Sequence, residues 1–254
     1  MKKILTVSML GLLSLPAVAL SAEEAAKEPE QTKYAGFALS GNVTAVTDYL
    51  SRGTSASRRR PAVQTTLNAN HDTGFYLSLF ASSVDLQDGE HTGLELDPTI
   101  GYTKEWENGF SVDVGILQYL YPAHPSRLDY DYREYFAGVG IKVLDANLKA
   151  KYYYSDDYMG VGDFSASYLD TQASYELPNK VTLKGHFGRA FGDVIKNANT
   201  RGISGYNDYS LGAAYEIFGL GFELTYVAMD KDGRIMNPLT EADNRFSLAV
   251  SKSF

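Results

Sequence analysis

Apolar residues recur at every second position through most of this chain, and that period of two constrains the fold more than any other feature. In one segment, Leu94, Leu96 and Ile100 alternate with the acidic residues Glu95 and Asp97. Successive side chains of a β-strand point to opposite faces, so each such segment is predicted to be a strand with one apolar face. The segments that alternate in this way are 39–45, 63–70, 75–81, 94–102, 110–116, 134–142, 147–154, 169–175, 181–187, 208–215, 220–226 and 246–254.

The connections between the predicted strands alternate in length. The short ones are 71–74, 107–109, 145–147, 178–179 and 217–219, and the long polar ones are 50–60, 85–92, 121–131, 156–163, 191–205 and 230–244. A soluble β-sandwich has no reason to gather its long loops at one end, whereas an outer-membrane barrel has short periplasmic turns and longer extracellular loops. Residues 34–254 are therefore predicted to form one all-β domain, a single transmembrane antiparallel up-and-down β-barrel of about 12 strands.

The first 22 residues have the pattern of a secretory signal peptide. Lys2 and Lys3 precede an apolar run over 4–15, and small residues allow cleavage after Ala19 or Ala22. Residues 23–33 are charged and nearly free of large apolar side chains, so they are expected to form a flexible periplasmic tail. Together with the barrel, these segments predict export to the outer membrane of a Gram-negative cell.

Composition excludes several other classes of protein. The formal net charge is −8, which disfavours a nucleic-acid-binding protein because such a protein needs a basic surface. The sequence has no cysteine, which excludes a disulfide scaffold and thiolate metal sites. The histidines lie in separate predicted elements without zinc-ligand spacing, so neither a metal nor another cofactor is expected. After the first 20 residues, no apolar run is long enough for a membrane helix.

The last predicted strand ends in an aromatic residue. Phe246, Leu248, Val250 and the terminal Phe254 occupy alternate positions and resemble the C-terminal signal that the barrel assembly machinery reads. Lys252 departs from that signal, since an apolar residue is usual there. The pattern predicts the barrel assembly machinery as a partner during biogenesis.

Several short motifs are similar to the TorF-type porin family, also described as Gcw-type conserved hypothetical outer-membrane proteins of proteobacteria. The opening block consists of Gly41-Asn42-Val43, Asp48-Tyr49, Arg52-Gly53-Thr54-Ser55 and Pro61-Ala62-Val63-Gln64. The segments 71–76, 151–155 and 206–209 extend the resemblance over nearly the whole mature chain. The resemblance implies an outer-membrane barrel called a porin by analogy, and it implies no substrate and no catalytic residue.

The polar faces of the predicted strands carry charges that would line the barrel lumen. An acidic wall facing a basic wall would produce a transverse field in a water-filled constriction, as in a channel for small hydrophilic solutes or ions. The alternative is that the charges pair across neighbouring strands and fill a closed lumen, which would make the barrel a structural or interaction protein. The candidate pore-lining residues are Glu95, Asp97, Asp113, Glu134, Lys142, Lys149, Lys151, Asp170, Lys184 and His186.

The first long loop carries a cluster of arginines. Arg52, Arg58, Arg59 and Arg60 are predicted to form an extracellular basic loop. Such a loop could bind the phosphates of lipopolysaccharide or attract anionic solutes, or it could simply be solvated. Outer-membrane lipid and lipopolysaccharide are thus expected partners, and a homo-oligomer is possible although no residue pattern marks an interface.

An outer-membrane hydrolase is the less favoured alternative. Such an enzyme would need a serine nucleophile, a histidine base and an orienting acid. Asp170, Ser174 and His186 share the predicted lumenal face of two neighbouring strands, but no hydrolase motif accompanies them. The sequence therefore predicts a barrel without catalytic residues.

Overall fold

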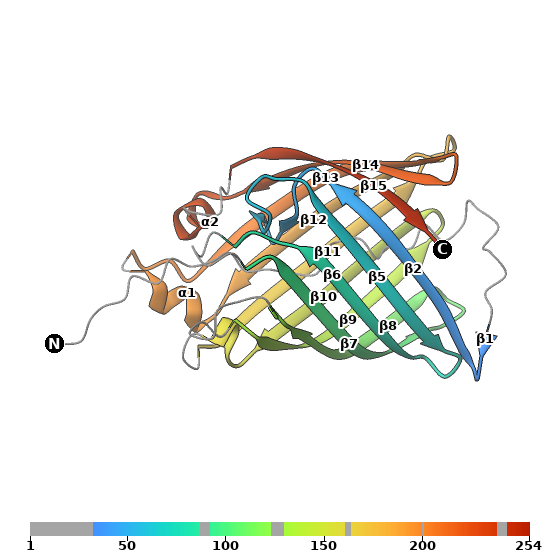
Figure 1. Cartoon of the computed structure of the whole chain (residues 1–254), viewed down its shortest axis with the longest axis horizontal. Helices are drawn as coiled ribbons and strands as arrows, with labels where there is room; N and C mark the ends of the chain where they lie inside the picture. The colour runs from blue at the N-terminus through green and yellow to red at the C-terminus, as the bar shows by residue number, and fades with distance from the viewer. Residues whose placement is uncertain (1–32, 87–91, 123–129, 161–163, 200, 238–242) are drawn as a thin grey trace.

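Twelve antiparallel strands form a closed barrel in the described part of the chain, which comprises residues 33–86, 92–122, 130–160, 164–199, 201–237 and 243–254 of the computed structural model (Figure 1). Each barrel strand pairs with the next along the chain, and β15 pairs with β2 to close the sheet. The all-β, up-and-down architecture predicted from the period of two is confirmed. In chain order the barrel strands are β2 (Phe37–Val46), β5 (Ala62–His71), β6 (Phe75–Ser83), β7 (Leu94–Glu105), β8 (Phe110–Tyr119), β9 (Tyr132–Val143), β10 (Ala146–Ser155), β11 (Ala166–Glu176), β12 (Thr182–Phe191), β13 (Gly205–Ile217), β14 (Leu220–Met229) and β15 (Arg245–Ser253).

The remaining elements are short. β1 (Lys33–Tyr34) pairs with the start of β2, and β3 (Leu50–Ser51) pairs with β4 (Thr54–Ser55) in a separate two-stranded sheet. The 3₁₀ turn η1 (Tyr158–Gly160) and the helices α1 (Asp193–Ala198) and α2 (Lys231–Met236) lie in connections between barrel strands. No helix in the described ranges is long and apolar enough to cross a membrane. The predicted signal peptide, residues 1–22, lies outside the described residues.

The two ends of the barrel differ as the loop lengths predict. At one end, here the short-turn end, two to five residues join the strands, and both β1 and the C-terminus lie there (Figure 1). Gly109 has a φ of +78°, and a Cβ at this position would lie 2.4 Å from the carbonyl oxygen of Lys142, so glycine is required for this turn. The opposite, long-loop end carries α1, α2 and the β3–β4 hairpin.

The outer face of the barrel is apolar. Leu211, Phe246 and Leu39 are 68%, 66% and 61% exposed, a degree of apolar exposure that lipid accommodates and water does not. Aromatic residues gather on this face at two levels, as girdles at two membrane interfaces would require. Near the short-turn end they include Phe75, Tyr102, Trp106, Phe110, Tyr175, Tyr215 and Phe222, and near the long-loop end they include Tyr135, Tyr152, Tyr154, Phe187, Tyr209, Tyr226 and Phe246.

The C-terminal residue contributes to the seam that closes the barrel. The backbone N–H of Phe254 donates to the carbonyl oxygen of Gly41 at 3.0 Å, and the N–H of Gly41 donates to the carbonyl oxygen of Phe254 at 3.0 Å. A Cβ at Gly41 would lie 2.9 Å from the Phe254 ring, so the terminal ring packs over the space that this glycine leaves. The apolar positions of the predicted assembly signal thus lie on the lipid side of the seam.

The interior of the barrel has two distinct halves. In the half next to the long loops, inward-facing residues are buried, and the side chains of Tyr49, Tyr119, Tyr121 and Tyr206 are almost completely inaccessible. In the half next to the short turns, inward-facing residues such as Thr225 remain partly accessible. The core of the protein therefore lies inside one end of the barrel, and the lumen continues from it toward the short turns.

Candidate functional site: the barrel lumen

A lumenal hairpin, Leu50–Ser55, lies inside the long-loop half. Its strands β3 and β4 pair with each other, and among the described residues they pair with no barrel strand. Arg52 and Gly53 form the two-residue turn with φ values of +44° and +80°, which is the geometry of a type I′ turn. The left-handed backbone conformation is unfavourable for arginine, and glycine or asparagine would adopt it more easily. The turn nevertheless has an arginine at this position and carries its guanidinium group at the tip of the hairpin.

The side chain of Arg52 is buried against the barrel wall that faces the hairpin. Its Nη2 atom donates to both carboxylate oxygens of Glu134, at 2.9 Å and 2.7 Å, and both side chains are at most 2% exposed. The guanidinium carbon lies 4.3 Å from the ring centroid of Tyr168 and 5.5 Å from that of Tyr153. The cation is thus held by one carboxylate and two aromatic rings, interactions that are strong once water is excluded.

The sequence pattern predicted that Arg52 belongs to the extracellular basic loop, and the structure shows that this prediction was wrong for Arg52. Arg52 is 3% exposed because the tight turn directs it inward, toward a buried counter-ion. The side chains of Arg58, Arg59 and Arg60 are 44–67% exposed and approach acidic residues of other loops. The exposed basic loop therefore consists of residues 58–60 alone.

Two further carboxyl groups are buried beside the lumenal hairpin. Glu95 accepts hydrogen bonds from the hydroxyl groups of Tyr49 and Tyr121, each at 2.7 Å. Burial, together with the adjacent Glu95 and Asp97 carboxyl groups, raises the pKa of the Tyr49 hydroxyl, so this loop residue remains a donor at neutral pH. Asp97 is fully buried, and neither of its oxygens accepts a hydrogen bond from a described donor.

The base of the lumenal hairpin is fastened by Asp48. Its carboxylate accepts hydrogen bonds from Ser55 at 2.5 Å and Ser57 at 3.1 Å, and Arg245 on β15 lies 3.1 Å from it. These contacts join the hairpin to the barrel rim through side chains rather than through a continuous sheet. The hairpin is therefore an inserted segment and not part of the wall.

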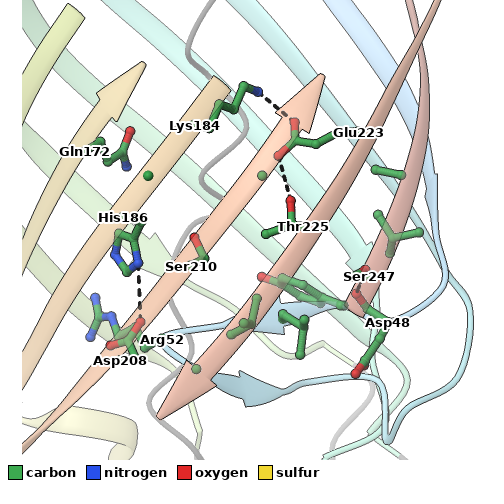
Figure 2. A pocket seen from close by; sticks show the side chains of 18 of the residues that line it. Asp48, Arg52, Gln172, Lys184, His186, Asp208, Ser210, Glu223, Thr225 and Ser247 are labelled. Carbon is green, nitrogen blue, oxygen red and sulfur yellow. Dashed lines mark hydrogen bonds and ion pairs between the residues drawn. The ribbon is translucent and has the colours of Figure 1, made fainter. Parts of the chain in front are cut away.

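The short-turn half contains ion pairs that water can reach. The Nζ atom of Lys184 on β12 lies 2.7 Å from Glu223 on β14 (Figure 2), and the Nζ atom of Lys151 on β10 lies 2.5 Å from Asp113 on β8. All four side chains are 23–27% exposed. Each pair spans an intervening strand, whereas the alternative of internal charge pairing expected pairs between neighbouring strands.

A cavity of about 170 Å³ lies between the lumenal hairpin and the wall formed by β2, β5 and β11–β15. Figure 2 shows it lined by Arg52 and Asp48 at one end and by the Lys184–Glu223 pair at the other. Gln172, Ser210 and other neutral polar groups lie between them. The polar space therefore extends from the hairpin toward the short turns.

His186 lies on this wall between two carboxylates. Its Nε2 atom is 3.1 Å from Asp170, and its Nδ1 atom is 3.6 Å from Asp208 (Figure 2). Asp208 also accepts a hydrogen bond from the Tyr168 hydroxyl at 3.0 Å. Asp208 and Tyr168 were not among the predicted site residues, although the polar parity of their strands would have placed them in the lumen.

The residues of the predicted acidic wall lie at different depths along the barrel axis. Glu95, Asp97 and Glu134 are in the long-loop half, whereas Asp113 is in the short-turn half together with the predicted lysines. Lys142 and Lys149 lie near the short-turn mouth, where they are exposed. The strand pattern predicted which face each residue occupies, but not its depth in the lumen.

The three residues considered for hydrolysis do not form a catalytic arrangement. Asp170 contacts His186, but Ser174 is in register with Lys184, and within the described ranges no hydrogen bond joins Ser174 to His186. Tyr168 occupies the hydrogen-bonding position beside His186 instead, at 3.2 Å. No group of three or more histidine or carboxylate side chains suited to a metal ion occurs among the described residues.

Known porins have similar barrels. The NanC porin has a TM-score of 0.54 and 12% identity, covering 84% of this chain and 98% of its own. The KdgM porin, also solved in complex with disordered oligogalacturonate, has a TM-score of 0.54 and 10% identity, covering 85% and 99%. These identities establish a shared fold alone, and no curated protein matches the sequence.

The family model described as "bacterial protein of unknown function (Gcw_chp)" matches residues 30–254. The match includes the whole barrel and agrees with the Gcw-type part of the resemblance seen in the sequence motifs. The chain is a member of the Gcw_chp family and has the closed twelve-strand barrel fold that is also found in porins.

Proposed function

We propose that this protein is an outer-membrane porin-like channel for passive diffusion of small hydrophilic solutes or ions. The observation that carries the proposal is a charged, water-accessible half-lumen inside a closed barrel whose outer face is apolar. Transmembrane barrels have a polar interior whether they are open or plugged, so the feature that favours a passage for hydrophilic solutes is that water reaches this half of the lumen. Export through residues 1–22 and insertion by the assembly machinery are parts of the same proposal.

The arrangement of the lumen corresponds to a closed state of this channel. Tyrosines and the lumenal hairpin fill the long-loop half, so a solute entering from the short-turn end meets the hairpin before it meets the loops. Because β3 and β4 pair with no barrel strand among the described residues, the hairpin can leave without breaking the barrel ladder. The channel is therefore one that opens when an inserted segment moves.

The charge pattern favours small solutes over long anionic chains. A polyanion needs a continuous track of cations, whereas Lys151 and Lys184 each form an ion pair with an acidic residue across the lumen. The KdgM porin has been solved in complex with oligogalacturonate, but the lumen of the present chain provides little support for binding of such a polyanion.

The second candidate is a closed structural barrel whose loops bind partners. The packed interior of the long-loop half is the observation that favours it, because a permanent core would serve such a protein well. The two candidates differ in one property, the ability of the lumenal hairpin to move. Hydrolysis is not supported by the contacts of His186.

Single-channel recording in a planar bilayer decides between the candidates. The purified protein is expected to give discrete but infrequent current steps, since the closed state predominates. Protease protection shows in the same preparation that the barrel is inserted. An inserted protein that never conducts, even under high voltage or after the hairpin is weakened, would contradict the channel and support the structural barrel.

A further inference from the structure

The environment of the Arg52 side chain has the chemistry of a site for organic cations. Glu134 provides a carboxylate, and Tyr153 and Tyr168 provide aromatic rings at 5.5 Å and 4.3 Å from the guanidinium carbon. A desolvated carboxylate with aromatic rings around it is a typical arrangement for binding guanidinium and alkylammonium groups. Three wall strands, β9, β10 and β11, contribute these side chains, so the site belongs to the barrel itself.

The occupant of this site, in contrast, belongs to the inserted hairpin. Only the Nη2 atom of Arg52 donates hydrogen bonds, and the buried Nε and Nη1 atoms meet no acceptor in the described part of the chain. The residue also has a φ of +44°, which is unfavourable for arginine. The guanidinium group of Arg52 thus fits the site imperfectly. A free cation, which has no such backbone constraints, could replace it.

Two further carboxyl groups lie near the site. Asp97 and Glu95 lie beside Glu134, and Arg52 forms its ion pair with Glu134. When the lumenal hairpin leaves, these carboxyl groups become hydrated and face the open lumen. A passage lined by three acidic residues at this depth attracts cations and repels anions.

We propose that Glu134, Tyr153 and Tyr168 form a binding site for small organic cations of the guanidinium type, and that Arg52 is its tethered occupant in the closed channel. The proposal rests on the proposed channel function and names its solute class as cationic. Displacement of Arg52 frees both the site and the passage, so an external cation and the lumenal hairpin compete for the same carboxylate.

Chemical rescue of Arg52→Ala tests the site. The variant is expected to raise the open probability of single channels about tenfold or more, because the hairpin loses its buried ion pair. Millimolar methylguanidinium should then block the variant channel and leave the wild-type channel unchanged. N-methylurea, which has a similar shape without the charge, is the matched control and should block neither.

A second readout does not require conduction. Methylguanidinium should raise the Tm of detergent-solubilised Arg52→Ala, because a ligand that binds the folded state stabilises it. The Tm of wild type and of the Arg52→Ala/Glu134→Gln double variant should not respond. If Arg52→Ala does not assemble, Arg52→Gln preserves most of the side-chain volume and supports the same comparison.

The outcomes separate the site from the channel. A Tm increase specific to Arg52→Ala without any current upholds the cation site and refutes the channel. Increased current that methylguanidinium does not block, together with an unchanged Tm, overturns the site and leaves the channel in place. Equal effects of methylguanidinium and N-methylurea would also overturn it, because the charge would then play no part.

Discussion

Replacement of Glu134 by glutamine is the sharpest single perturbation of the closed state. The substitution keeps the shape of the side chain and removes the charge that neutralises Arg52, whose Nη2 atom lies 2.7 Å and 2.9 Å from the two carboxylate oxygens. In the closed barrel the guanidinium group would then be buried without a counter-ion. In the open barrel it would be hydrated, so the loss of interaction affects the closed state alone.

The expected magnitude follows from the burial of the pair. Both side chains are at most 2% exposed, and removing one partner of such a pair costs about 3–5 kcal/mol. At about 1.4 kcal/mol per factor of ten, the ratio of open to closed channels should rise by about 140- to 3,700-fold. The contact of Arg52 with Tyr168 remains, which places the result toward the lower end of this range.

Single-channel recording of Glu134→Gln beside Glu223→Gln measures this effect. Glu223 also loses an ion pair with a lumenal lysine, but that pair is about one-quarter exposed and does not touch the hairpin, so its loss should cost about 1 kcal/mol or less. The open probability should therefore rise strongly in the first variant and little in the second. Equal open probabilities in both variants would refute the assignment of the hairpin as the closing element.

Three further substitutions test other contacts. Tyr49→Phe removes one of two hydroxyl donors to Glu95 and should destabilise the closed state by about 1–3 kcal/mol. The channel should then open more often, and an unchanged open probability would argue against that contact. Gly41→Leu places a side chain where the Phe254 ring lies and should slow barrel assembly, which heat-modifiable gel mobility measures. Assembly at the normal rate would show that the ring can move. Lys184→Gln removes a positive charge from the accessible half and should shift the reversal potential in a salt gradient toward cations, and no shift would mean that ions do not pass this residue.

The architecture of the barrel was predictable because it depends on local patterns. The period of two determines the face of each side chain, and the alternation of loop lengths determines the end at which each connection lies. Both rules apply residue by residue, without knowledge of contacts between distant segments. Because the number of strands is even, β15 and β2 run antiparallel where they pair to close the barrel.

The long-loop half could not be predicted in the same way. Arg52-Gly53 signals a tight turn, but its direction depends on Glu134, which lies 82 residues further along the chain. The same limitation applies to Tyr49, whose partner Glu95 is 46 residues away. A loop that folds into a barrel has no periodic pattern in its sequence. Its position therefore depends on its contacts with the wall and can be determined only when the structure of the wall is known.

The lumen is accessible from the short-turn half and closed by the hairpin and core in the long-loop half. Because the chain has no cysteine, single cysteines report on this directly. Ser210 lines the cavity, whereas Ser82 is 1% exposed in the closed half, so Ser210→Cys and Ser82→Cys form a matched pair of small substitutions. A charged thiol reagent should label Ser210→Cys rapidly and Ser82→Cys slowly in the folded barrel. Equal labelling rates at the two positions would contradict the closed half and, with it, the role of the hairpin in closing the lumen.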